Sequence, residues 1–377
     1  MGDPFSQEVY IAGVGMTPFG RHESATVVDL GHEAVTTALA DAGLDYDAVE
    51  LAYCGHVLQG TTAGQKVLYS VGATGVPIFN VENACASGTT ALRAAAMAVG
   101  SGMAKVALAV GFEVMGKGAI PTRGDERLEA LASKGAPAMP AMFSRVFAAH
   151  AERYGTSLEQ LAMVSVKNRA YGAKNPRAQF HDPVTLDDVM ASREVAPPLR
   201  LLMCCPTTSG AAAAVVSSAD VARTTRRPVR MVASALQSDP MVDEDDPLAG
   251  ITAINTSVMR AAYEQAGVAP DDLDCAEVHD CFSIAEIIHY ENLGLCERGE
   301  GGRFVEQGLE RARVHVSTSG GLLAKGHPLG ATGVAQAVEA VEQLRGESGG
   351  RQVENARLAL THCQGFGGAA GVHIFAA

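Results

Sequence analysis

A strand–helix–strand pattern occurs twice in this chain, and the repeat limits the possible folds more than any other feature. Residues 9–57 contain an apolar strand, an amphipathic helix and a second strand, and residues 229–283 follow the same order, with their helix expected over 255–267. Each helix is followed by a glycine, Gly43 or Gly267, and glycine in that position marks a helix end. We therefore expect two related α/β halves.

The similarity of the halves continues downstream. Two segments, "ACASGTTALRAA" (84–95) and "LGATGVAQAVEA" (329–340), each place a small hydroxyl residue and glycine at the start of a helix. Two others, "KVALAVGFEV" (105–114) and "ARLALTHCQGF" (356–366), are apolar strands that lead into glycine. Alternating strands and helices favour βαβ units, so we expect an α/β fold with mixed, mainly parallel sheets.

Residues 118–206 interrupt the repeat. They contain clustered charges, several prolines and a long polar stretch, and we expect them to form an inserted loop domain. Long insertions often cover active sites. The predicted N-terminal half is then residues 1–117 plus 207–224, and the predicted C-terminal half is residues 225–377.

The composition excludes some classes of partner and indicates a compartment. The chain has 377 residues, and its net charge of −13 argues against nucleic acid or an anionic membrane as the main partner. No apolar run is long enough to cross a bilayer. The eight cysteines occur without a secretory signal, which predicts free thiols in the cytoplasm. Since the sequence contains no C-x-x-C pair, we also expect no bound metal.

Four reactive side chains each stand at a strand end or helix start, and all of them except His279 have glycine close by in the sequence. They are Cys85, His279, His327 and Cys363. Ligands of α/β proteins bind at the carboxyl ends of strands, so symmetric packing of the halves would bring the four together. Cys85 precedes a helix whose N-terminal N–H groups and dipole would hold the thiol near its deprotonated, nucleophilic form.

The motifs around these residues resemble those of one family. "NACASG" (83–88), "HDCF" (279–282), "GHPLGATG" (326–333) and "CQGFGG" (363–368) occur in the order, and with the insertion, of thiolases of the sterol-carrier-protein type. The resemblance covers essentially the whole chain. It implies a five-layered α-β-α-β-α fold, an inserted loop domain that binds coenzyme A, and a homodimer or tetramer.

The resemblance also implies a role for each reactive group. Thiolases make or break the bond between the α and β carbons of a 3-ketoacyl-CoA without a metal. Cys85 matches the nucleophile that holds the acyl group as a thioester, and Cys363 matches the second acid/base. His327 and His279 match the groups that bind the thioester oxygen directly or through water, and His327 also matches the group that activates the thiol. The backbone N–H groups of Cys85 and Gly365 match a second oxyanion hole.

The remaining cysteines and histidines are interpreted as structural. Cys281 is adjacent to His279 but should point away from it, and His362 should face the side of its strand opposite to Cys363. Several basic residues of the insertion and its edges are candidates for the coenzyme A phosphates, although solvated surface charge is the default for such residues. They are Lys117, Arg123, Arg127, Arg145, Lys167, Arg169, Lys174 and Arg177.

The leading hypothesis is a thiolase, an acyltransferase of lipid metabolism such as fatty acid or sterol degradation, with acyl-CoA as substrate, coenzyme A as co-substrate and no permanently bound cofactor. The alternatives are a ketosynthase-type condensing enzyme, an acyl-CoA side-chain aldolase, and a non-catalytic lipid- or acyl-CoA-binding protein. Some relatives of this type work beside a small acyl-CoA-binding protein, so such a partner is also expected. One departure from the family pattern is Phe366, which interrupts the glycines after Cys363 and would reshape the second oxyanion hole.

Overall fold

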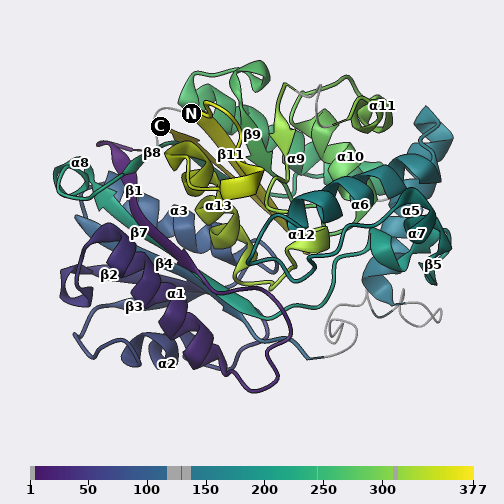
Figure 1. The fold of residues 1–377 in the computed structure, drawn as a ribbon. Coiled ribbons are helices and arrows are strands. Elements are labelled where there is room, and N and C mark those ends of the chain that lie inside the picture. The colour runs from purple at the N-terminus through teal and green to yellow at the C-terminus, as the bar shows by residue number, and fades with distance from the viewer. Residues whose placement is uncertain (1–4, 117–128, 130–136, 244, 309–312) are drawn as a thin grey trace.

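The computed structural model describes residues 5–116, 129, 137–243, 245–308 and 313–377 (Figure 1). Within them, ten strands join in the order β10-β9-β11-β12-β8-β1-β7-β4-β2-β3. The strands of the first half are β1 (Val9–Met16), β2 (Leu51–Gly55), β3 (Ile78–Val81), β4 (Val106–Glu113) and β7 (Gly210–Ser218). Those of the second half are β8 (Val229–Ser238), β9 (Cys275–Glu277), β10 (His315–Val316), β11 (Leu358–Gly365) and β12 (Ala369–Ala376).

The strand order is the same in both halves when it is read outward from the centre of the sheet. The first half runs β1-β7-β4-β2-β3, and the second runs β8-β12-β11-β9-β10. The two central strands, β1 and β8, pair antiparallel between residues 9–11 and 229–231, so the two sheets are continuous. The repeat in the sequence therefore corresponds to two halves of equal topology.

The strands of each half run mainly in one direction. In the first half β2 pairs in parallel with both β3 and β4, and in the second half β9 pairs in parallel with β10 and β11. One strand in each half, β7 or β12, is reversed and makes antiparallel ladders with both of its neighbours. This is the mixed, mainly parallel arrangement that the sequence predicts.

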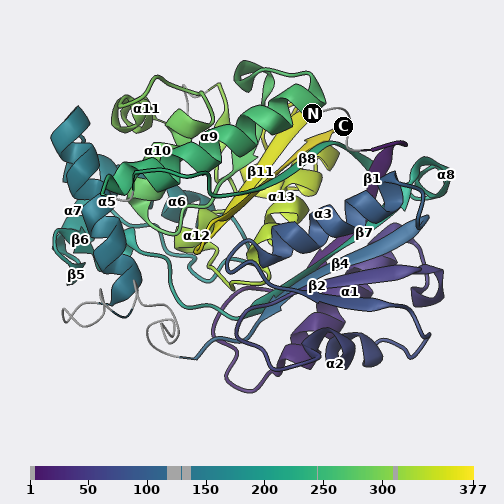
Figure 2. The same ribbon diagram turned by 180° about the vertical axis from the view of Figure 1, so that it is seen from behind.

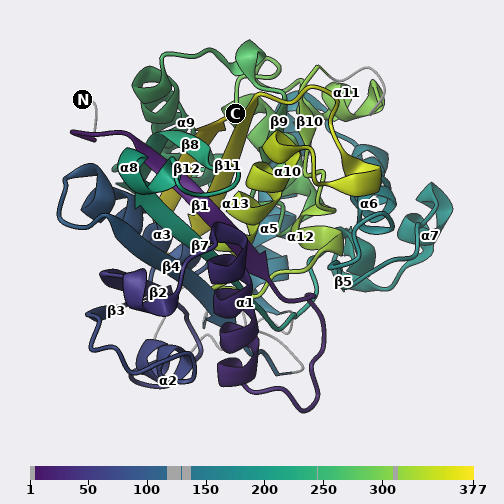
Figure 3. The same cartoon turned by 60° about the vertical axis from the view of Figure 1, so that its left-hand side comes forward.

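Three pairs of helices complete five layers (Figures 1–3). Helices α1 (Val27–Ala42) and α2 (Ala63–Tyr69) cover the outer face of the first half's sheet. Helices α3 (Ser87–Gly100) and α13 (Thr332–Arg345) form a shared layer between the two halves. Helices α9 (Pro247–Ala266) and α10 (Ser283–Asn292) cover the outer face of the second half's sheet. One buried cluster contains residues of α3, α13 and both sheets. The predicted α-β-α-β-α arrangement is confirmed.

Helix ends follow the predicted glycines. Gly43 and Gly267 adopt the left-handed conformation, with φ of 66° and 67°, directly after α1 and α9. The start of α9 differs from the expected position 255, because the helix begins at Pro247, where Asp246 caps it and accepts a hydrogen bond from the N–H of Leu248. Proline is favourable at a first helical position, and its aspartate neighbour supplies the capping oxygen.

The insertion contributes a lobe beside the second half, visible to the right in Figure 1. Its described elements are α5 (Ala138–Tyr154), α6 (Leu158–Gly172), α7 (Leu186–Ala191), β5 (Glu194–Ala196) and β6 (Leu199–Arg200). Side chains of the lobe such as Phe143 and Leu161 pack with Ile284 of α10 and with Leu322 in one buried cluster. The exact domain boundaries given above stay a prediction.

Short helices fill the connections: α8 (Ala219–Ala222), α11 (Gly301–Glu306) and α12 (Gly321–Ala324), with 3₁₀ turns at Tyr46–Ala48, Leu201–Met203, Pro270–Asp272 and Gly349–Arg351. Among the described residues, no helix combines the length and the apolar character needed to span a bilayer.

The two central helices touch backbone to backbone at their N-terminal ends. A Cβ built on Gly88 of α3 would lie 2.5 Å from the carbonyl oxygen of Gly330, and one built on Gly333 of α13 would lie 2.3 Å from the N–H nitrogen of Thr89. No side chain fits at such distances, so glycine is required at both positions. This contact places the segment before α3 next to the segment before α13.

We expect Gly333→Ala to reduce the free energy of unfolding by roughly 1–3 kcal/mol, because the added methyl group overpacks a contact made of backbone. Chemical denaturation monitored by circular dichroism measures this change. Gly250→Ala is the matched control, since Gly250 is also helical and its Cβ would meet no atom within 4 Å. The control should gain up to ~1 kcal/mol from helix propensity, and an equal loss in both variants would contradict the packing argument.

Candidate active site

Cys85 stands in a tight turn between β3 and α3. The preceding residue, Ala84, has a φ of 48°, which is uncommon for a residue other than glycine. The hydroxyl of Ser87 holds this turn, because it accepts from the N–H of Asn83 at 2.9 Å and donates to the carbonyl of Ala84 at 2.6 Å. Cys85 remains partly exposed to solvent at the N-terminal end of α3.

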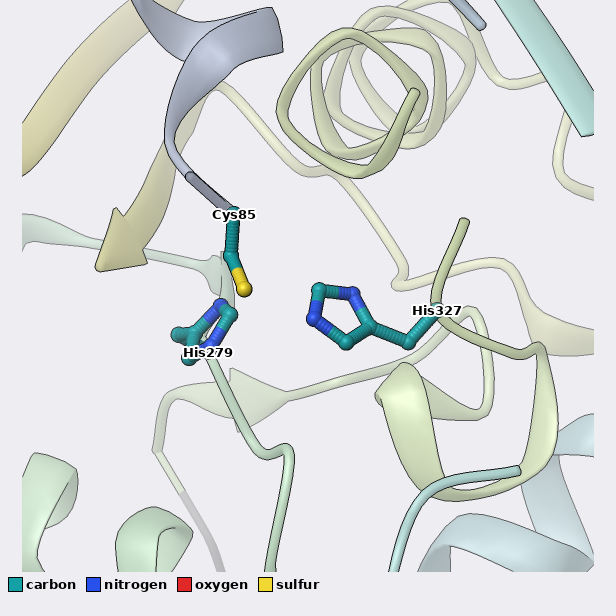
Figure 4. A group of neighbouring side chains, drawn as sticks. All are labelled: Cys85, His279 and His327. Atoms are coloured by element: carbon teal, nitrogen blue, oxygen red, sulfur yellow. The ribbon is translucent and has the colours of Figure 1, made fainter. Parts of the chain in front are cut away.

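The other three predicted residues meet Cys85 from the second half of the chain. His279 follows β9, His327 lies in the loop between α12 and α13, and Cys363 lies in β11. Figure 4 shows the sulfur of Cys85 next to both imidazole rings, whose centroids are 5.0 Å apart at an angle of 78°. The structure therefore brings all four predicted side chains to one site.

Cys363 is the residue that connects the groups. Its Sγ lies 3.0 Å from the carbonyl oxygen of Cys85 and 3.3 Å from Nδ1 of His279. The thiol thus donates to the carbonyl of Cys85, and Nδ1 of His279 is a second acceptor in the tautomer that leaves this nitrogen unprotonated. Burial is complete for this side chain and raises the pKa of Cys363 well above its usual value, so Cys363 holds its proton at rest and can act as an acid.

The hydrogen bonds around His327 fix its tautomer. Nδ1 of His327 lies 2.8 Å from the hydroxyl of Thr332, and that hydroxyl donates its own proton to the carbonyl of Pro328 at 2.9 Å. The hydroxyl oxygen must therefore accept from Nδ1–H. This leaves the lone pair on Nε2, which is buried, has no partner among the described residues and belongs to the ring edge facing Cys85 in Figure 4.

The expectation that the helix end holds Cys85 near its deprotonated form stays a prediction, and the surroundings of the thiol oppose it. Cys85 as a residue is partly exposed, but protein atoms surround its thiol, and this desolvation raises the pKa of Cys85 to about 12, although the N–H groups of Phe366 and of Cys85 itself oppose the shift. Burial also lowers the pKa of His327 well below its usual value and that of His279 to about 3. A neutral thiol therefore faces neutral imidazoles, because a closely packed interior penalises every charged form.

The glycine assigned to the second oxyanion hole has a clear packing reason. A Cβ on Gly365 would lie 2.1 Å from the carbonyl oxygen of Asn83, so only glycine lets β11 approach the Cys85 turn this closely. The downstream N–H that bonds to the Cys85 thiol belongs to Phe366, the residue that departs from the family's glycine pattern. The role of Gly365 as an oxyanion donor stays a prediction.

Asp280 anchors the segment that carries His279. Its carboxylate oxygens accept from the N–H of Leu322 in α12 and from the side-chain amide of Asn168 in α6, both at 2.8 Å. Burial raises the pKa of Asp280 to about 8. The insertion lobe and the catalytic segment are therefore joined by hydrogen bonds directly behind His279.

Three of the predicted residues form a donor set for a metal. One ligand atom each from Cys85, His279 and His327 lies within 4.8 Å of the others. Thiol and neutral imidazole are ligands that Zn²⁺ accepts, usually after the thiol has lost its proton. The expectation of no metal came from the cysteine spacing and from the thiolase resemblance, and it stays a prediction.

Most described candidates for the coenzyme A phosphates are already engaged. Lys167 pairs with Glu286, Arg177 pairs with Glu342, and the guanidinium of Arg169 lies 4.2 Å over the ring of Phe180. The side chains of Arg145 and Lys174 are exposed. Lys117, Arg123 and Arg127 lie outside the described residues.

Other parts of the sequence interpretation can be compared with the structure directly. His362 turns away from Cys363, as predicted, and contacts the amide oxygen of Asn255 at 2.7 Å. Cys281 packs in the buried cluster shared with the lobe. The sequence interpretation assigned no role to Thr332, although it lies within the quoted segment "GHPLGATG". A hydroxyl shortly after a reactive histidine, at the first position of the following helix, was the available signal.

Comparisons with known proteins agree with this architecture. Residues 9–220 match the family model described as "Thiolase, N-terminal domain", and residues 233–377 match "Thiolase C-terminal domain-like". The chain is 44% identical over 385 residues to an acetyl-CoA acetyltransferase of Methanothermobacter thermautotrophicus, covering 98% of this chain and 99% of the relative. It is 41% identical over 394 residues to human sterol carrier protein 2, covering 98% of this chain and 72% of that protein.

A solved structure is similar over the same extent. The Ltp2–ChsH2(DUF35) aldolase superposes with a TM-score of 0.86 at 29% identity, covering 98% of each chain. The resemblance drawn from the four motifs is thus confirmed.

We expect Thr332→Val to lower kcat/KM by about 10- to 100-fold, because an imidazole without its Nδ1 acceptor no longer keeps Nε2 directed at Cys85. Thr361→Val is the matched control, since Thr361 is buried in β11 and its hydroxyl has no partner among the described residues. Steady-state kinetics of both variants test the assignment. Equal activity in the two variants would remove Thr332 from the site's geometry.

The pH dependence of Cys85 alkylation tests the neutral resting state. Because burial raises the pKa of Cys85 to about 12, the thiolate fraction should increase with pH, and the rate of reaction with iodoacetamide should keep rising above pH ~9. Peptide mass spectrometry measures this rate. A plateau near neutral pH would show instead that the thiolate is already formed.

Proposed function

The chain belongs to the thiolase family, and we propose that within it the protein is a CoA-dependent acyltransferase that cleaves or forms 3-ketoacyl-CoA through an acyl-Cys85 thioester. The observation that carries the proposal is the meeting of two thiols and two neutral imidazoles at one site. A nucleophilic thiol that also leaves well suits acyl transfer to another thiol. The second thiol, Cys363, supplies the acid/base that carbon–carbon cleavage requires.

In the first step Nε2 of His327 takes the proton of Cys85 as the sulfur attacks the 3-keto carbon of the substrate. The neutral pair at rest means that proton transfer and attack are coupled rather than preceded by a stable thiolate. Once protonated, Nε2–H becomes a donor in a densely packed site, where it stabilises the oxyanion that forms on the former keto oxygen. One ring thus serves in turn as base and as oxyanion donor.

The bond between the α and β carbons then breaks, and its electron pair passes to the departing acetyl-CoA. Cys363 donates its proton to that carbon, and His279, 3.3 Å away at Nδ1, stands next to the sulfur as it becomes charged. In the second half of the reaction Cys363 recovers a proton from the thiol of coenzyme A. The coenzyme sulfur attacks the acyl-Cys85 thioester and releases a shortened acyl-CoA. Cys85 leaves as a thiolate and takes back the proton from Nε2 of His327, which restores both groups.

We expect wild-type protein incubated with a 3-ketoacyl-CoA in the absence of free coenzyme A to gain one acyl mass on the peptide that contains Cys85. Cys85→Ala should abolish both this mass and thiolysis. Cys54→Ala, which removes a buried thiol of β2 away from the site, is the control and should retain both. An unmodified wild-type peptide would contradict the proposal. A panel from acetoacetyl to steroid esters would then define the substrate.

A second candidate is retro-aldol cleavage of a side-chain acyl-CoA, favoured by the similarity to the aldolase structure. Such cleavage forms no acyl-cysteine. Activity that survives Cys85→Ala would therefore favour the aldolase. The name of that structure also includes a DUF35 partner, which supports the expectation of a small partner protein for this chain.

We also propose that the protein is a homodimer and works in the cytoplasm. β3 is an edge strand of the described sheet, and its Phe79 and the nearby Leu58 are large apolar side chains that are 46% and 39% exposed. An apolar edge of this kind favours pairing with another strand. All eight cysteines are free, which suits a reducing compartment.

Light scattering coupled to size exclusion tests the dimer. Phe79→Lys should shift the wild-type dimer toward monomer, because the charged side chain would be buried at the paired edge. Met103→Lys changes a residue that is 72% exposed elsewhere on the surface and should leave the mass unchanged. A monomeric wild-type protein would disprove the dimer without affecting the proposed chemistry.

A further inference from the structure

We propose that Gln336 of α13 is a positioning residue for this reaction: its side-chain amide holds the ends of β9 and β11, and through them His279 and Cys363, at the separation that proton transfer needs. The inference rests on the proposed function. It gives Gln336 no contact with substrate.

The pairing of β9 and β11 ends just before the reactive side chains. The last residues in register are Glu277 and Thr361. At the next position on each strand, the side chain of Gln336 replaces the backbone hydrogen bonds between the strands. Its Nε2 donates to the carbonyl of Val278 at 3.0 Å and to the carbonyl of His362 at 2.9 Å. The amide of Gln336 therefore bridges the two chains where their ladder stops.

Each bridged carbonyl belongs to the residue directly before a reactive one. Val278 precedes His279, and His362 precedes Cys363. The two reactive atoms, Nδ1 and Sγ, are 3.3 Å apart across the same gap. A sideways shift of either strand end would change this separation with no flexible segment to absorb it.

The chemistry of Gln336 argues against a role in packing alone. Both of its partners are carbonyl oxygens, so the amide nitrogen must face them, and Oε1 is left buried without a partner among the described residues. An unpaired buried acceptor is costly. An apolar side chain of the same size, such as methionine, would fill the space without this cost but would leave the two strand ends unlinked.

The same helix offers a matched control. Gln343 lies two turns further along α13 and is also buried. Its Nε2 donates to the carbonyl of Arg351 at 2.9 Å and to the hydroxyl of Thr318 at 3.2 Å, and its Oε1 accepts from the N–H of Val353 at 2.8 Å. None of these partners adjoins a reactive residue.

The experiment compares Gln336→Met with Gln343→Met in the full chain. Both should melt at a lower temperature than the wild type, because each loses buried hydrogen bonds. Only Gln336→Met should lower kcat, by about 10- to 100-fold, with little change in KM, and should slow the exchange of the acetyl-CoA α-hydrogens in D₂O. Wild-type kcat in Gln336→Met, or equal losses of kcat in both variants, would overturn the inference.

A second variant keeps the test open where Gln336→Met does not fold. Gln336→Glu has the same size but at most one proton to share between the two carbonyls, so its crystal structure should show Sγ of Cys363 further than 3.3 Å from Nδ1 of His279. An unchanged separation would overturn the inference. This measurement needs no enzyme activity. A wild-type protein without thiolysis would therefore disprove the proposed function, while the distance between Sγ of Cys363 and Nδ1 of His279 in the wild type and in Gln336→Glu would still decide the positioning role.

Discussion

The structure depends on the backbone contact between the N-terminal ends of α3 and α13. Every catalytic group of the proposed reaction lies on, or next to, a segment that this contact positions. The turn with Cys85 leads into α3, the loop with His327 leads into α13, and α13 itself holds the strand ends that carry the other two groups. Gly88 and Gly333 permit the approach because any side chain there would enter the neighbouring backbone. The site is therefore a consequence of how closely two central helices pack.

The charge states of the groups in the site follow from the same close packing. Closely packed protein disfavours charge on Cys85, on His327 and on His279 alike, so their protons are distributed by hydrogen bonds rather than by ion pairs. Thr332 decides which nitrogen of His327 is basic, although it touches no reacting atom. In the proposed reaction, a resting state without charges means that His327 becomes an oxyanion donor only after Cys85 has given up its proton. Activation and stabilisation are then two stages of one proton transfer.

Much of this arrangement could be predicted from the sequence. The repeat predicts two halves, and Gly43 and Gly267 end their helices as expected. Cys85, His327 and Cys363 were found because glycines lie close to each of them in the sequence, and His279 was found because it follows an apolar strand and belongs to the motif "HDCF". Gln336 was not found, because nothing in the sequence distinguishes it from Gln343 of the same helix, and its two partners lie 58 and 26 positions away. The burial that raises the pKa of Cys85 could not be foreseen either, since a helix terminus is visible in a sequence and the packing around it is not.

The pairing of β1 with β8 joins two halves that each carry only part of the site. The first half carries Cys85, the nucleophile of the proposed reaction, and the second half carries both imidazoles and the other thiol. Cutting the chain in the connection between β7 and β8 would give two fragments. One would expose the face of α3 that contains Gly88, the other would expose the face of α13 that contains Gly333, and neither would turn over substrate. When the two fragments are mixed, activity would return only to the extent that α3 and α13 pack together again through Gly88 and Gly333. Complementation between the fragments would therefore measure how well this helix contact re-forms.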